Sequence, residues 1–217
     1  MTIRTTGPLC NGRERVAERK ARKDAVRNRE AVLAAADDLF ANCESPENIT
    51  MADVAAAARV GKATLFRAYG DRTGLIRALY TARLQPLAEA VEAGPPPLGT
   101  ETPPRERILA VLDALLCFKL ENRRLALALE EGGSGSPYQG AGYAKWHGLL
   151  KAMLEQIPGL DECDFAAHAL LAAIRADLVE HLAGPENVAP ETIRAQLALF
   201  VSRVIGSPSP PNAHTEH

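Results

Sequence analysis

The side chains best suited to a definite chemistry are basic and polar residues gathered in one short stretch of the chain. Lys62, Thr64 and Arg67 would lie on one side of a short helix, from which Leu65 and Phe66 would point inward. Lys and Arg donate hydrogen bonds to guanine edges and to phosphates, and Thr can contact either, so this surface is suited to duplex DNA. The residues expected to contact DNA are Thr50, Lys62, Ala63, Thr64, Arg67, Tyr69 and Arg72.

Two short helices, at about 51–58 and 63–69, must position these side chains. Thr50 followed three residues later by Asp53 has the spacing of a capping box, which begins a helix. Gly70 is a typical helix stop, because glycine adopts positive φ without strain. Two such helices joined by a turn of three or four residues have the dimensions of a helix-turn-helix, whose second helix enters the major groove.

Residues 50–79, TMADVAAAARVGKATLFRAYGDRTGLIRAL, closely resemble the DNA-binding signature of the TetR family of bacterial transcriptional regulators. In that signature, two residues separate Thr from Asp-Ile/Val-Ala, and Ala-Gly-Val-Ser and a recognition helix follow. The matching positions are Thr50, Asp53, Val54, Ala55, Ala58, Val60, Thr64, Leu65, Arg72 and Leu75.

The resemblance implies both a fold and a function. It implies an all-α protein in which a three-helix helix-turn-helix domain precedes a helical domain for ligand binding and dimerisation. It also implies a ligand-responsive homodimer that binds a double-stranded DNA operator. We expect a repressor that an unknown small-molecule inducer releases from a palindromic operator.

Five positions depart from the signature. Arg59 stands in place of the turn glycine, where a left-handed residue other than glycine costs about 1 kcal/mol. Gly61 replaces the serine that would cap the recognition helix. Phe66 and Ala68 replace a Tyr and a His that commonly touch phosphates, and Tyr69 replaces a Phe. We therefore expect the turn and the phosphate contacts to differ in detail from those of the family.

Charge is divided unequally along the chain. Residues 1–80 hold 14 Lys and Arg against 10 Asp and Glu, whereas residues 81–217 hold 11 against 17. Residues 11–30 alone carry eight basic side chains against four acidic ones. One end of the chain is therefore suited to a polyanion. We expect residues 1–22 to form a flexible basic arm that either follows DNA phosphates or is simply solvated.

Beyond the helix-turn-helix the hydrophobic periodicity is helical throughout. The expected helices cover 24–42, 73–93, 104–120, 122–131, 141–156, 162–183 and 190–205. Segments rich in glycine and proline, at 94–104 and 132–137, separate some of them. The predicted fold class is all-α, with the DNA-binding domain at 23–72, the ligand-binding and dimerisation domain at 73–205, and a disordered tail at 206–217.

The last two helices are the ones that the resemblance assigns to dimerisation. The expected contact residues are Phe165, Ala169, Ala172, Ala173, Ala176 and Val179, then Ile193, Leu197, Phe200, Val201 and Val204. The alternative is that both are core helices of a monomer.

A ligand cavity would need apolar walls with a few polar groups. The residues expected to bind the ligand are Phe118, Tyr138, Tyr143, Trp146 and His147.

Two pairs of possible metal ligands lie four residues apart on one predicted helix. They are Asp164 with His168, and Asp177 with His181. His168 and Asp177 are nine residues apart, about half a turn out of phase, so the two pairs face opposite ways and cannot share one ion. We expect ordinary surface pairs here, with no metal and no cofactor.

Several other classes of protein are disfavoured. The four cysteines form no CxxC pair, and the chain has neither a signal-peptide pattern nor an apolar run of about 18 residues. We therefore expect a cytoplasmic protein without a membrane partner. No HExxH, GxSxG, Walker or Rossmann pattern occurs, so we expect no enzyme. The alternatives are an architectural DNA-binding protein without a ligand and, less favoured, a helical enzyme.

Overall fold

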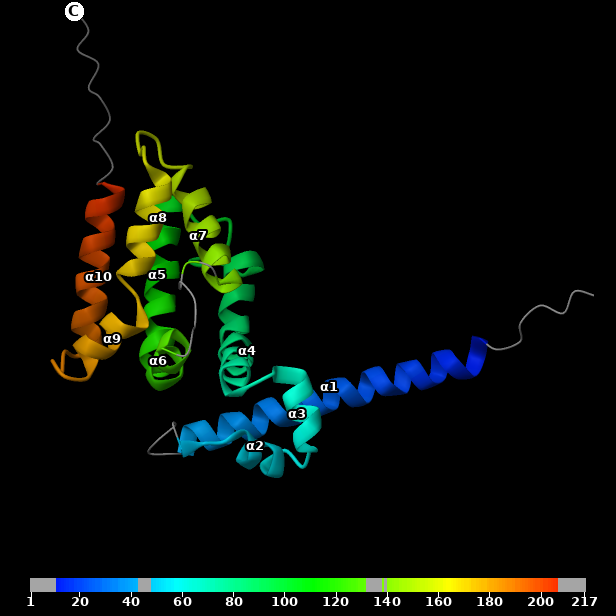
Figure 1. The fold of residues 1–217 in the computed structure, drawn as a ribbon. Helices are drawn as coiled ribbons and strands as arrows, with labels where there is room; N and C mark the ends of the chain where they lie inside the picture. Colours follow the sequence, from blue (N-terminus) through cyan, green and yellow to red (C-terminus); the bar gives the residue numbers. More distant parts are fainter. Residues whose placement is uncertain (1–10, 43–47, 132–137, 139, 207–217) are drawn as a thin grey trace, which may run out of the picture. The chain divides into compact units, whose positions relative to one another are not determined.

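The computed structural model describes residues 11–42, 48–131, 138 and 140–206, and every regular element in them is an α-helix (Figure 1). The helices are α1 (Asn11–Asn42), α2 (Met51–Ala57), α3 (Lys62–Tyr69), α4 (Arg72–Ala93), α5 (Pro104–Glu121), α6 (Arg123–Glu131), α7 (Ala141–Leu154), α8 (Cys163–Ala172), α9 (Ala176–Ala183) and α10 (Pro190–Ile205). The all-α prediction is confirmed for this part of the chain. No helix in it is long and apolar enough to cross a bilayer.

The chain divides into two compact units, and the division falls within α4. The first unit covers residues 1–79 and the second covers residues 80–217. In the first unit, α2 packs against the second half of α1, and α3 packs against α2 (Figure 1). The buried apolar side chains of this unit are Val32, Ala36, Ile49, Met51, Val54, Ala55, Leu65, Leu75, Ile76 and Leu79.

Helix α1 is longer than the sequence pattern predicts. It begins at Asn11, so residues 11–22, which the sequence pattern places in a basic arm, are helical. This segment is rich in Arg, Lys, Glu and Ala, which are strong helix formers even without an apolar stripe. The side chains of residues 22–31 are all exposed. Residues 1–10 of the predicted arm and residues 207–217 of the predicted tail lie outside the described residues.

In the second unit, α5 is the central helix. Helices α7, α9 and α10 pack against it, α8 packs against α7, and α6 packs against α9 (Figure 1). The most deeply buried side chains of this core are Val91, Ile108, Val111, Leu112, Leu116, Leu150, Leu154, Ala167, Leu170, Ile174 and Val201. The second unit therefore has an apolar core of its own.

One predicted helix, 162–183, is two helices. Ala172 ends α8 and Ala176 begins α9. Between them, Ile174 is buried, and Arg175 has an extended backbone with φ −60° and ψ 146°. Asp177 lies in the first turn of α9 and accepts a bond from the Leu178 amide at 2.8 Å. An acidic side chain there is favourable beside the positive end of the helix dipole, so Asp177 is a helix-start signal within the apolar periodicity.

Two arginines tie elements of the second unit together. Arg107 is buried, and its guanidinium donates to the carbonyls of Leu98 at 2.8 Å and Val91 at 2.7 Å. It therefore joins α5 to the end of α4 and to the following loop. Arg123 of α6 forms two bonds to the Glu180 carboxylate of α9, at 2.8 and 2.9 Å. The hydrogen bond from Arg123 holds the pKa of Glu180 below its usual value.

Candidate nucleic-acid interface

Helix α2 begins with the capping box that the sequence predicts. The Thr50 hydroxyl accepts a bond from the Asp53 amide at 3.2 Å, and the Thr50 amide donates to Asp53 Oδ2 at 2.9 Å. The hydroxyl also donates to Oδ2 at 2.6 Å. These bonds, from the side chain first and then the backbone of Thr50, hold the pKa of Asp53 below its usual value. The capping box is confirmed, and the hydroxyl expected to clamp a phosphate is bonded within the start of its own helix.

The turn between α2 and α3 contains a strained residue. Arg59 has φ 55°, the left-handed conformation expected for the position that a glycine commonly takes. The Val60 amide donates to the Ala55 carbonyl at 3.0 Å and closes the turn. Gly61 precedes α3 with φ −66° and ψ 138°, and no side chain caps the helix there. The turn therefore keeps the helix-turn-helix geometry without the usual glycine or the usual capping hydroxyl.

Helix α3 presents a polar and basic face to solvent. Leu65 is completely buried and anchors the helix. The exposed residues expected to read DNA are Lys62, Ala63, Thr64 and Arg67. Phe66 is 48% exposed, so the prediction that it points inward is wrong. Helix α3 contacts the rest of the unit along a narrow face centred on Leu65. Phe66, the next residue, is rotated about 100° around the helix axis from that face. Phe66 is therefore available for apolar contact with DNA, for example with thymine methyl groups.

Two of the expected phosphate clamps, Tyr69 and Arg72, direct polar atoms into the first unit. The Tyr69 hydroxyl oxygen is buried and has no hydrogen-bond partner within the described residues, and burial raises the pKa of this phenol. The Arg72 Nε donates to the Ile49 carbonyl at 3.0 Å, and the guanidinium lies 5.7 Å from the centre of the Phe40 ring. The Nε of Arg72 is therefore bonded within the first unit, where the sequence predicts a phosphate contact.

Three arginines of the expected basic arm, together with Arg29 beyond it, form a row on α1. Residues Arg15, Arg19, Arg22 and Arg29, here called the α1 basic stripe, are all exposed. Their spacings of four, three and seven residues place them within an arc of about 80° on one face of the helix. Burial raises the pKa of Tyr69 and the positive charge of Arg29 opposes this rise, so the Arg29 end of the stripe lies near α3. The sequence contains the helical spacing of these arginines. Because no apolar stripe accompanies it, the sequence pattern predicts a flexible segment instead of a helix.

The expected ligand-binding residues do not form one group. The rings of Tyr138 and Tyr143 meet edge to face with their centres 5.2 Å apart. The ring of His147 is stacked on that of Tyr143, with the two centres 6.1 Å apart. Trp146 is buried in the core of the second unit. Phe118 instead packs edge to face on Tyr80 of α4, at 5.1 Å. A hollow of about 570 Å³ between α5 and α10 is lined by none of these five residues.

Only some of the predicted dimer contacts, Phe165 and Phe200 among them, are exposed. Val179, Ile193, Leu197 and Val201 are buried in the core of their own chain, so this part of the expected interface is wrong. These residues belong to α9 and α10, and both helices pack against α5 of the same chain. The large apolar side chains exposed on α8, α9 and α10 are Phe165, Leu178, Leu199 and Phe200.

The capped α2, the tight turn and the exposed basic α3 define a helix-turn-helix DNA-binding regulator. A family profile, described as bacterial regulatory proteins of the tetR family, matches residues 32–79. The chain is 25% identical over 166 residues to an HTH-type transcriptional regulator of Staphylococcus aureus (strain MRSA252), covering 74% of this chain and 84% of that protein. The profile match lies in the helix-turn-helix part of the chain, and the Staphylococcus aureus relative is itself an HTH-type transcriptional regulator.

Solved structures of other proteins share this fold. A transcriptional regulator from Rhodococcus sp. Rha1 shares 22% identity, covers 82% of this chain and 95% of its own, and superimposes with a TM-score of 0.59. The FadR repressor of Thermus thermophilus, solved in complex with lauroyl-CoA, shares 14% identity, covers 84% of this chain and 97% of its own, and has a TM-score of 0.55. At these identities the likeness concerns the fold.

Proposed function

We propose that this regulator is a homodimeric repressor that binds a palindromic operator and leaves it when a small molecule binds its second unit. In this proposal residues 23–72 read the DNA, and residues 73–205 bind the ligand and the partner chain. The observation that carries the proposal is the exposed face of α3. Lys62, Thr64 and Arg67 point to solvent while Leu65 holds the helix in place, and this is how a recognition helix presents donors to base edges.

Exposed apolar side chains support dimerisation. Phe165 of α8 is 74% exposed, and Leu199 and Phe200 of α10 are 53% and 38% exposed. Exposed side chains of this size on neighbouring helices are typical of a surface that a partner covers. A second copy is the natural partner, because a palindromic operator is read by two recognition helices about one helical turn apart.

Sedimentation and selection from random duplexes test the proposal together. The full chain should sediment as a dimer at micromolar concentration and select a pseudo-palindrome whose half-site centres lie about 34 to 36 Å apart. Phe200→Glu should shift the protein toward monomer because it places a charge in the proposed interface. Val26→Glu is the matched control, since Val26 is 56% exposed on α1 in the first unit. A monomer that selects no sequence would refute the proposal.

A further inference from the structure

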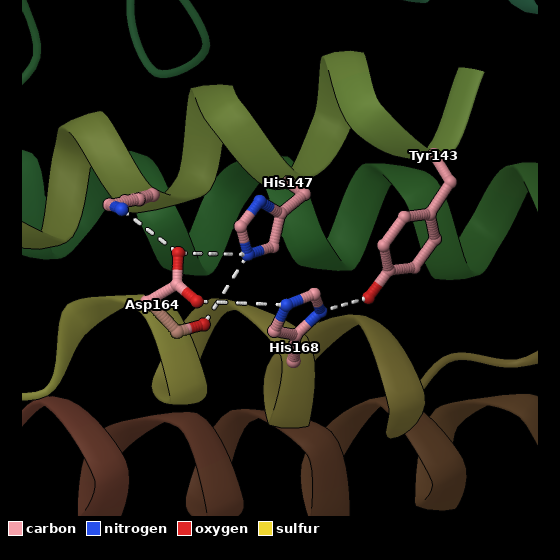
Figure 2. A network of polar contacts seen from close by, with 5 residues as sticks. Tyr143, His147, Asp164 and His168 are labelled. Atoms are coloured by element: carbon pink, nitrogen blue, oxygen red, sulfur yellow. Dashed lines mark hydrogen bonds and ion pairs between the residues drawn. The ribbon is translucent and has the colours of Figure 1, made fainter. Parts of the chain in front are cut away.

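Three side chains from two helices converge at one place in the second unit (Figure 2). Asp164 and His168 are one turn apart on α8 and share a face, and His147 of α7 lies opposite them. His147 Nε2 is 3.8 Å from Asp164 Oδ1, and His168 Nε2 is 3.8 Å from Asp164 Oδ2. One possible ligand atom from each residue lies within 4.8 Å of the other two. The sequence shows the α8 pair but not the third residue, which comes from 17 positions upstream of Asp164 on another helix.

The second predicted pair behaves differently. Asp177 is bonded to Arg175 at 2.9 Å, and His181 is paired with Glu186 at 3.0 Å. Each member of this pair therefore has a separate partner, as expected for ordinary surface residues. The contrast leaves the His147, Asp164 and His168 group as the one set of three possible ligands in the described part of the chain.

We propose that His147, Asp164 and His168 bind one divalent transition-metal ion of the zinc class. Two imidazole nitrogens and one carboxylate oxygen are a ligand set that Zn²⁺ accepts, and that Co²⁺ and Ni²⁺ share. Hard ions such as Mg²⁺ and Ca²⁺ prefer all-oxygen sites and are disfavoured here. Three protein ligands leave the fourth position of a tetrahedral ion open to water or to a small molecule.

The distances require only side-chain movement. Ligand atoms on one tetrahedral Zn²⁺ lie about 3.3 Å apart, given metal–ligand bonds of about 2.0 to 2.1 Å. The two imidazole nitrogens are each 3.8 Å from Asp164 but from different oxygens of it, so binding through one oxygen needs the carboxylate to rotate as well as the distances to shorten. The side chains of Asp164 and His168 are 60% and 39% exposed, so both have room to rotate. The two imidazole rings stack at 4.0 Å, and rotation of one ring turns its nitrogen toward the shared ion.

A neighbouring phenol orients one of the ligands. The Tyr143 hydroxyl lies 2.6 Å from His168 Nδ1 (Figure 2). When Nδ1 carries the proton and donates it to the phenol oxygen, the lone pair of Nε2 faces Asp164 and is free for a metal. Bonds of this kind commonly fix the tautomer and the ring angle of metal-binding histidines. Tyr143 is therefore a positioning residue in this proposal.

The competing explanation is a polar clamp between α7 and α8 that binds no ion. Lys151 of α7 donates to Asp164 Oδ1 at 2.9 Å and already neutralises the carboxylate. Lys151 is 40% exposed, so an arriving cation can displace its ammonium into water. The clamp explanation predicts that metal ions leave the structure unchanged. The two explanations therefore differ in a direct binding measurement.

Co²⁺ titration of the full chain, followed by Zn²⁺ competition, tests the site without DNA. The wild-type protein should bind one Co²⁺ per chain with the visible bands of a four-coordinate site, and Zn²⁺ should abolish them. His147→Gln and His168→Gln should each weaken binding at least tenfold, and Tyr143→Phe by about tenfold. The matched controls, His181→Gln and the double variant His214→Gln/His217→Gln, should bind as the wild type does. Mg²⁺ should not compete.

A second measurement needs no variant and guards against misfolding of the substituted chains. The sequence has five histidines, and one equivalent of Zn²⁺ should shift the imidazole nitrogen resonances of two of them in long-range ¹⁵N–¹H spectra. Assignment of the shifted pair to His181 and a tail histidine would overturn the proposal. So would the absence of stoichiometric Co²⁺ binding, or unchanged binding in both His147→Gln and His168→Gln. Because no DNA is present, any of these results leaves the proposed operator binding untouched.

Discussion

The α1 basic stripe should contribute to operator binding mainly through its charge. Replacing Arg15, Arg19 and Arg22 with Gln removes three exposed cations while keeping good helix formers. The three residues cover about 10 Å of helix and share one face, so they can follow neighbouring phosphates together. Removing one phosphate contact reduces the slope of log affinity against log salt by about 0.9. The slope of the triple variant should therefore be smaller by up to about 2.7 units for each chain.

Fluorescence anisotropy across a salt series measures this slope. The matched control replaces Arg124, Lys145 and Arg203 with Gln, which removes the same charge from exposed positions of the second unit. Its line should remain nearly parallel to that of the wild type, because surface charges far from DNA are screened within about 10 Å. Sequence preference should persist in both variants, since phosphate contacts carry no base information. A stripe variant whose line is parallel to the wild-type line would refute a role of this helix in DNA binding.

Three further outcomes are expected. Lys62→Ala and Arg67→Ala should each weaken operator binding by about 1 to 3 kcal/mol without changing the circular dichroism spectrum, and wild-type affinity in both would mean that α3 does not read bases. Arg59→Gly should raise the free energy of unfolding by about 1 kcal/mol, because φ is 55° there, and an unchanged urea midpoint would contradict this. Glu180 has a lowered pKa in the folded protein, so the stabilisation by its pair with Arg123 is present above the unfolded value of 4.5 and is lost as the pH falls through the lower folded value. The difference in the free energy of unfolding between wild type and Glu180→Gln should therefore shrink as the pH falls from about 5 to about 3. A difference that stays constant over this range would count against the ion pair.

The helix-turn-helix could be predicted because its signals are local. Thr50 and Asp53 are three residues apart and bond to each other, and Gly70 stops α3 with φ 76°. Such features depend on backbone geometry over a few residues, so residue type and spacing suffice to recognise them. The conformation of Arg59 was likewise predictable from its place in the turn.

Features that depend on packing between distant residues could not be predicted. The residues around Phe66 do not reveal that, of the two apolar side chains on α3, Leu65 is buried and Phe66 is exposed. The approach of His147 to the α8 pair follows from the packing of α7 on α8. The break between α8 and α9 lies beside the buried Ile174, in a stretch whose apolar periodicity continues without interruption. Each of these outcomes is a tertiary contact that local patterns leave open.

The buried guanidinium of Arg107 restricts which sequences can replace this one over evolution. It serves two carbonyls that lie outside any helix ladder, those of Val91 and Leu98. Lys has one charged nitrogen and cannot match the planar fork, and an apolar residue would leave both carbonyls buried without donors. Drift at this position should therefore be accepted only together with a change in the segment between α4 and α5. In relatives that retain this arginine, the length of that segment should be retained as well.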